Sequence, residues 1–235
     1  MSRHHVVGFG GAAESGKSTS ADMLVSIAQP YQHEHIEFSD PILMSASEWL
    51  RNVDENTVND NEARVRLLAH ILSESLVMQL LDLSKVTTQL NEGYLKNVLD
   101  GALNVPVTPE NKSSHRPLLE WLGHTAIELV SPRVWGDIVQ QKVANAIGRG
   151  ADLVTVGGVR TKSDYEVVHN LGGTVMSLHR SRDNEPLLTE RQLTDWVADF
   201  KINNNGSLED LRERLAVIWA QISVDQDADN WLKAA

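Results

Sequence analysis

The stretch Gly11-Ala-Ala-Glu-Ser-Gly16-Lys17-Ser18-Thr19 fits the phosphate-binding pattern G-x-x-x-x-G-K-[ST] and directly follows an apolar run, Val6–Phe9. An apolar stripe at helical spacing comes after it, formed by Ala21, Leu24, Ile27 and Ala28. The order is therefore a strand, a phosphate loop and a helix. The glycines allow backbone N–H groups to point at phosphate oxygens, and the helix dipole adds its positive end.

Each loop residue type suits one part of a bound nucleotide. Lys17 would reach the β- and γ-phosphates, and the Ser18 hydroxyl would contact a magnesium ion that bridges them. The residues that we expect to bind the nucleotide here are Gly11, Ala13, Glu14, Ser15, Gly16, Lys17, Ser18 and Thr19. The implied cofactors are ATP and Mg²⁺, with Ser18 as the metal ligand.

Composition restricts the class of partner. The net charge of −11 argues against an extended nucleic-acid surface, although a local basic cleft is compatible with it. No run of about eighteen apolar residues is present, and the N-terminus lacks the apolar core of a signal peptide. We therefore expect no membrane partner and a cytoplasmic location, which is the host cytoplasm if the chain is phage-encoded. The histidines show no metal-binding spacing such as H-E-x-x-H.

Four further segments predict strands: Glu34–Phe38, Asp152–Val156, Thr174–Leu178 and Phe200–Ile202. The chain between the second and third of the five strands is mostly helical in pattern, apart from a polar loop at 54–61 and another at 101–115. Helices are expected at about 42–53, 62–83, 90–99, 117–129 and 131–147. This order predicts an α/β fold: a three-layer parallel sheet of about five strands with a large helical insertion after the second strand.

Several passages together resemble the bacteriophage deoxynucleoside monophosphate kinases, which are P-loop nucleotide kinases. Besides the loop, they are Phe38-Ser-Asp-Pro-Ile42, Arg116–Gly123 with Trp135 downstream, Val159-Arg160 and Asp199–Leu211. The resemblance implies ATP- and Mg²⁺-dependent phosphoryl transfer to a deoxynucleoside monophosphate, giving the diphosphate. It also implies small-molecule nucleotides as partners and leaves homodimer formation open.

The resemblance also implies how one domain of residues 1–235 is divided. Residues 1–53 and 150–225 would form the core, about 54–149 the acceptor-binding insertion, and about 179–198 an arginine-bearing lid. One departure affects the metal: the resembled kinases usually have an aspartate two residues before the arginine that matches Arg160, and this chain has Gly158. Asp40 is then the leading acid for a magnesium-bound water or for orienting the acceptor, with helix N-capping as its alternative role.

The remaining candidates bind the acceptor or the transferring group. Arg116, Arg133 and Arg160 are predicted to contact the acceptor phosphate, with solvated or ion-paired surface roles as the alternative. Arg180 and Arg182 are predicted catalytic lid arginines. Trp121 would stack on the acceptor base or belong to the core, and Asn205 would contact adenine or simply form a turn.

Two other functions fit the same loop. The acceptor could be a modified base in DNA or a dephospho-coenzyme-like molecule, or the protein could be an ATP-binding regulator without a small-molecule acceptor. A helical insertion together with clustered arginines favours a kinase over a regulator, because a regulator needs neither an acceptor pocket nor a charge-neutralising lid.

Overall fold

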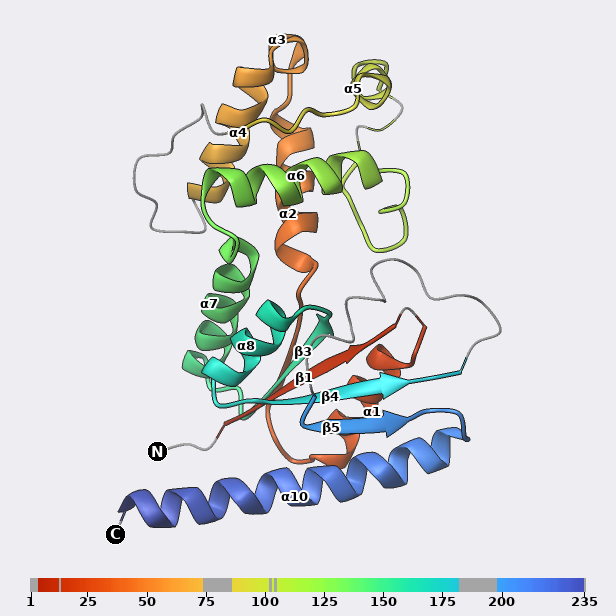
Figure 1. The fold of residues 1–235 in the computed structure, drawn as a ribbon, viewed down its shortest axis with the longest axis vertical. Helices are drawn as coiled ribbons and strands as arrows, with labels where there is room; N and C mark the ends of the chain where they lie inside the picture. Colours follow the sequence, from red (N-terminus) through yellow and green to blue (C-terminus); the bar gives the residue numbers. More distant parts are fainter. Residues whose placement is uncertain are drawn as a thin grey trace. The chain divides into compact units, whose positions relative to one another are not determined.

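The computed structural model describes residues 4–12, 14–73, 86–101, 103, 105–181 and 198–234. Its sheet is parallel throughout and has the strand order β2-β3-β1-β4-β5 (Figure 1). The strands are β1 (His5–Gly11), β2 (His33–Glu37), β3 (Leu153–Val159), β4 (Thr174–His179) and β5 (Phe200–Asn203). All five predicted strands are present, and the predicted α/β fold is confirmed.

The described helices are α1 (Lys17–Ile27), α2 (Asp40–Asn52), α3 (Glu55–Asn59), α4 (Asn61–Ser73), α5 (Glu92–Leu99), α6 (Arg116–Leu129), α7 (Val134–Gly148), α8 (Lys162–Asn170) and α10 (Leu208–Ala234). The predicted polar loop at 54–61 was wrong in part, because Asp54 caps the short helix α3 by accepting a 2.6 Å hydrogen bond from Thr57 N–H. The second half of the helix predicted at 62–83 lies outside the described residues. Among the described helices, none combines the length and apolar character needed to cross a membrane.

The chain divides into two compact units. The first unit comprises residues 1–38 and 139–235, and the second unit comprises residues 39–138. The predicted division into a core, an insertion at about 54–149 and a lid at about 179–198 stays a prediction, and most of the lid lies outside the described residues.

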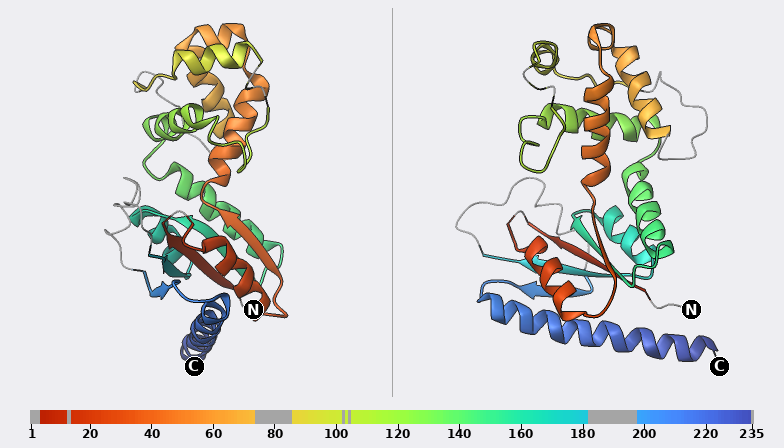
Figure 2. Two further views of the ribbon diagram at one scale, coloured as in Figure 1. Left: turned by 90° about the vertical axis from the view of Figure 1, so that its right-hand side faces the viewer. Right: turned by 180° about the vertical axis from the view of Figure 1, so that it is seen from behind.

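The first unit buries both faces of its sheet. Side chains alternate along a strand, so Val6 and Val154 face α7 and α8, whereas Val7 and Leu153 face α1 and α10. The back view in Figure 2 shows α1 lying against the strands with α10 beside it. Covering of both faces explains why the strands are continuous apolar runs, as is usual for parallel sheets.

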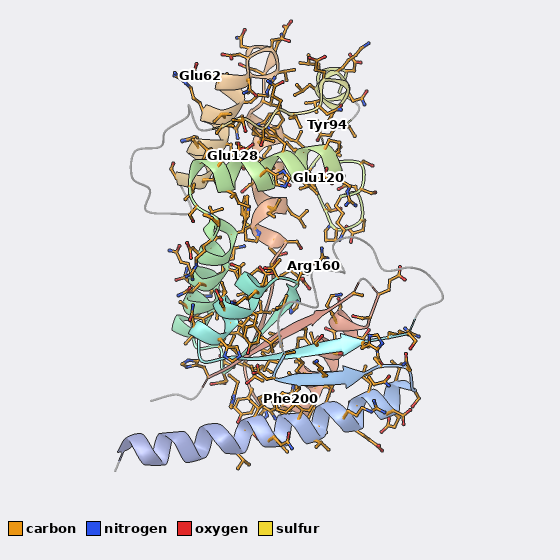
Figure 3. All side chains as sticks on the ribbon, in the orientation of Figure 1. Glu62, Tyr94, Glu120, Glu128, Arg160 and Phe200 are labelled. Atoms are coloured by element: carbon orange, nitrogen blue, oxygen red, sulfur yellow. The ribbon has the colours of Figure 1, made fainter. Side chains whose placement is uncertain are left out.

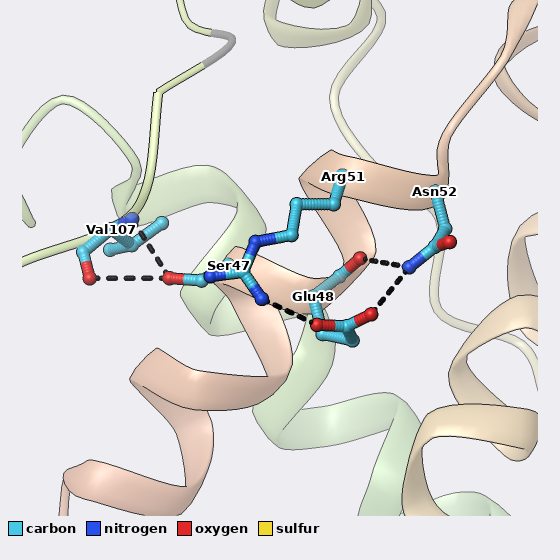
Figure 4. A network of polar contacts seen from close by, with 5 residues as sticks. All are labelled: Ser47, Glu48, Arg51, Asn52 and Val107. Carbon is cyan, nitrogen blue, oxygen red and sulfur yellow. Dashed lines mark hydrogen bonds and ion pairs between the residues drawn. The ribbon is translucent and has the colours of Figure 1, made fainter.

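The second unit has its own apolar core, centred on α2, α4 and α6. Trp49 of α2 is fully buried and meets Trp121 of α6 edge to face, with ring centroids 5.9 Å apart. Polar contacts on α2 fix a neighbouring segment: the Ser47 hydroxyl accepts from Val107 N–H at 2.9 Å and donates to its carbonyl at 3.3 Å (Figure 4).

A buried histidine should make this protein less stable in acid. His115 is fully buried, its Nδ1 lies 2.9 Å from the Tyr94 hydroxyl, and burial lowers the pKa of His115 below 6.5. Because the folded state binds this proton less tightly than the unfolded state, stability should be complete above that pH and decline as the pH falls below it. The slope from one histidine cannot exceed about 1.4 kcal/mol per pH unit.

Urea unfolding between pH 7.5 and 5.5 checks this expectation. His115→Gln should unfold with a shallower pH dependence than the wild type. Burial and the neighbouring His35 also lower the pKa of His33, but that group is present in both proteins, so the difference isolates His115. Equal slopes for the two proteins would contradict the prediction.

Candidate active site

The phosphate loop connects β1, the central strand, to α1. Gly11 has φ +127° and Gly16 has φ +99°, values that side chains rarely adopt. A Cβ on Gly11 would also overlap the Leu178 carbonyl oxygen of β4. Both glycines are therefore required by the backbone path, which supports the loop assignment made from the sequence. Ser18 and Thr19 are exposed in the first turn of α1, and Ala13 lies outside the described residues.

The side chain of Lys17 folds back over this loop. Its Nζ donates to the carbonyl oxygen of Gly11 at 2.9 Å and to that of Ala12. Ser15 beneath it is 1% exposed, and its hydroxyl has no hydrogen-bond partner among the described residues. The ammonium group is thus held inside the loop, where the phosphates of a nucleotide would replace the carbonyl contacts.

Asn204, which we did not predict, fixes the loop from a distant part of the chain. Its Nδ2 donates to the Ser15 carbonyl oxygen at 2.8 Å and fills the space that a Cβ on Gly16 would need. The backbone N–H of Asn204 donates to the His179 carbonyl at 2.7 Å. The turn after β5 therefore positions the phosphate loop. The only sequence signal for it is the run Asn203-Asn-Asn-Gly206, which also reads as an ordinary turn.

The predicted adenine contact, Asn205, lies beside Asn204 and uses its amide elsewhere. Its Oδ1 accepts from Ser181 N–H at 2.6 Å, and its Nδ2 donates to the Ser181 hydroxyl at 3.0 Å. These bonds fasten the chain just after β4 to the turn after β5. A contact between Asn205 and adenine stays a prediction.

Two predicted arginines stand where parallel strands end, the usual ligand-binding edge of such a sheet. Arg160 follows β3 and is exposed; Figure 3 labels it. Its backbone N–H donates to Asp164 Oδ2 at 2.9 Å, within the capping box that starts α8. Arg180 follows β4 and is also exposed. Arg182 lies outside the described residues.

The other arginine candidates and Asp40 belong to the second unit. Arg116 begins α6 and pairs with Glu120, labelled in Figure 3, at 2.8 Å, while Arg133 lies 3.7 Å from Asp137. Both pairs are exposed and contribute little stability. Asp40 is the first residue of α2 and Ser39 is the N-cap, so Asp40 favours the helix start through its charge and not as the cap.

Trp121 is placed in the apolar core of the second unit. It is 2% exposed, and its Nε1 donates to the Thr88 carbonyl at 3.2 Å. The ring is therefore not available for stacking on a base in this structure, which favours the core alternative over the substrate-binding role listed for it from the sequence.

Substituting this tryptophan separates the two roles. Trp121→Phe loses the hydrogen bond to Thr88 and some packing, so we expect a loss of about 1–3 kcal/mol in unfolding free energy. The KM for the acceptor should change less than about twofold, because the ring contacts no ligand. Urea unfolding and initial-rate kinetics provide the two measurements. A raised KM with unchanged stability would restore the stacking role.

The donor set of the first unit suits magnesium. Among the described residues, no group of three or more His, Asp or Glu side chains could hold a metal ion by itself. Mg²⁺ commonly needs only one or two protein oxygens, because phosphates and waters complete its shell. The exposed Ser18 hydroxyl in the first turn of α1 fits that requirement.

The parallel sheet and the phosphate loop that follows its central strand define the class, an α/β protein with the P-loop NTPase fold. Within that class, the family model for deoxynucleotide monophosphate kinase matches residues 6–215. The chain belongs to this family and is a phosphotransferase with deoxynucleotide monophosphate kinase activity.

Other comparisons add little. Among solved structures, the crystal structure of TT1252 from Thermus thermophilus aligns with 93% of this chain and 98% of its own chain, at 16% identity and a TM-score of 0.40. A comparison with curated proteins gives no match.

Proposed function

We propose that this kinase transfers the γ-phosphoryl group of ATP, with Mg²⁺, to the phosphate of a deoxynucleoside monophosphate. The bond between the γ-phosphorus and its bridging oxygen breaks, an acceptor phosphate oxygen bonds to that phosphorus, and ADP and a deoxynucleoside diphosphate leave. The geometry of the phosphate loop supports this reading most directly: two glycines at positive φ and an ammonium group held over the loop carbonyls.

The side chains of the first unit contribute position and charge, which are the main needs of phosphoryl transfer. Lys17 and the loop N–H groups would bind the donor phosphates, and Asn204 keeps that loop in place. Arg160 and Arg180, with Arg182, would neutralise charge on the transferring group. Bound magnesium would supply further charge neutralisation on the β- and γ-phosphates, with Ser18 as its protein ligand.

The acceptor would be bound by the second unit. Arg116 and Arg133 are exposed there, and their present partners are weak surface carboxylates that a phosphate could replace. Asp40 remains a candidate for orienting the acceptor. The identity of the accepted base, the cytoplasmic location and homodimer formation stay predictions.

The test is coupled ADP release from ATP and Mg²⁺ with each of dAMP, dCMP, dGMP and dTMP and with their ribose counterparts. At least one deoxynucleotide should stimulate turnover tenfold or more. Turnover that is equal with and without every monophosphate would overturn the proposal and favour DNA, a coenzyme precursor or a regulatory role.

A further inference from the structure

A carboxylate from β2 covers two adjacent glycines at the end of β3. Glu37 pairs with Gly157 in the register of the two parallel strands. A Cβ built on Gly157 would overlap the Glu37 carboxyl group, and one built on Gly158 would lie 3.0 Å from Glu37 Oε2. The Glu37 side chain therefore occupies the space above β3 that side chains at positions 157 and 158 would otherwise take.

The backbone at Gly158 explains why the acid comes from another strand. Gly158 has φ +76°, which side chains other than that of glycine adopt at a cost. An aspartate there would combine this strain with a close approach to a second carboxylate. The end of β3 is thus built for a carboxylate reaching across from β2.

A chain of hydrogen bonds orients that carboxylate. His35 Nε2 lies 3.1 Å from Glu37 Oε1, His35 Nδ1 lies 2.8 Å from Thr155 Oγ1, and His33 Nε2 lies 2.9 Å from the same Oγ1. One set of protons satisfies every link with neutral rings: His33 donates to Thr155, Thr155 donates to His35, and His35 donates to Glu37. Thr155 is fully buried, so the chain is anchored in the sheet.

These groups lie on the face of the sheet that carries the phosphate loop helix. Ile36, Val154 and Val156 face α7 and α8, so by alternation Glu37, Thr155 and Gly157 face the side of α1. Helix α1 contacts both β1 and β3, and Lys17 and Ser18 are its first two residues. The Glu37 carboxylate and the Ser18 hydroxyl therefore share one face at the carboxyl ends of neighbouring strands.

We propose that Glu37 is the acid that holds the water shell of nucleotide-bound magnesium, with His35 and Thr155 as positioning residues. This inference rests on the proposed function, and it assigns to Glu37 the metal role for which Asp40 was the leading candidate from the sequence. One carboxylate beside a hydroxyl ligand is a sufficient protein contribution for this ion, because phosphates and waters fill the other positions.

The test measures metal binding without any acceptor or turnover. Mn²⁺ is titrated into the protein with ADP, and free Mn²⁺ is followed by electron paramagnetic resonance; ADP affinity in EDTA is measured separately. Glu37→Gln should weaken Mn²⁺ binding to the ADP complex by about tenfold, as expected for a residue that orients metal-bound water, and leave metal-free ADP affinity within twofold.

The matched control is Glu34→Gln on the same strand. Glu34 lies on the opposite face, where it pairs with Arg149 at 2.6 Å, and this variant should bind Mn²⁺ like the wild type. His35→Ala keeps the Glu37 carboxylate but removes its orientation, so it should give a smaller loss. It also serves as the test variant if Glu37→Gln does not fold, as judged by thermal unfolding.

Unchanged Mn²⁺ binding by Glu37→Gln, or a loss seen in Asp40→Asn instead, would overturn this inference. An equal loss of metal-free ADP binding would overturn it too, since the effect would then concern the nucleotide. The proposed function is judged separately by deoxynucleotide-stimulated turnover of the wild type, so the two failures are distinguishable.

Discussion

Lys17→Ala should lower turnover with ATP and a deoxynucleoside monophosphate by about a thousandfold. The Lys17 ammonium group is held over the phosphate loop by the carbonyls of Gly11 and Ala12, so it is already in place when the nucleotide binds. Its loss removes a positive charge that should act more strongly on the transferring group than on the ground state. We therefore expect a fall in kcat that is larger than the rise in KM for ATP.

Coupled ADP release at saturating substrates measures this effect. Lys201→Ala is the control, because Lys201 is an exposed lysine on β5 and its removal changes the net charge equally. That control should keep at least half of the wild-type rate. If Lys17→Ala retains more than a tenth of wild-type kcat, the catalytic role assigned to this lysine is wrong.

Gly11→Ala should destabilise the protein by about 2–5 kcal/mol and abolish nucleotide binding. The position has φ +127°, and an added Cβ would overlap the Leu178 carbonyl of β4, which belongs to the backbone and cannot rotate away. The same Cβ would lie 2.8 Å from Ser15 Oγ. Either the loop or the β1–β4 pairing must move, and both changes disturb the phosphate site.

Gly148→Ala is the matched control for that substitution. Gly148 ends α7, has no atom within 4 Å of a built Cβ and has no positive φ, so alanine should raise stability by up to about 1 kcal/mol. Urea unfolding and ADP titration distinguish the two variants. Wild-type unfolding and ADP binding by Gly11→Ala would contradict the loop geometry described here.

Part of the site could be predicted because its signals are local. The loop Gly11–Thr19 carries its chemistry within consecutive residues, and the glycine spacing reflects backbone angles that the structure bears out at Gly11 and Gly16. Arg160 and Arg180 were also located correctly at strand ends, because an apolar run followed by a polar residue marks the end of a buried strand.

Other parts depend on residues that are distant in sequence. Asn204 reaches Ser15 across most of the chain, and its own neighbourhood resembles any turn. Trp121 sits at helical spacing, which does not distinguish a core tryptophan from one that stacks on a base; only its burial beside Trp49 does. The short helix α3 was missed because one capping contact, from Asp54, outweighs its polar composition.

The sequence by itself determined the α/β class, the five strands, the phosphate loop and the kinase family, because side-chain periodicity and a contiguous motif encode them. Only the tertiary structure decided the strand order β2-β3-β1-β4-β5, the anchoring of the loop by Asn204 and the placing of Glu37 over Gly157 and Gly158. The physical reason is that these features arise from pairing between separate strands. A strand's own sequence states which side chains are apolar, but not which neighbour it will lie against.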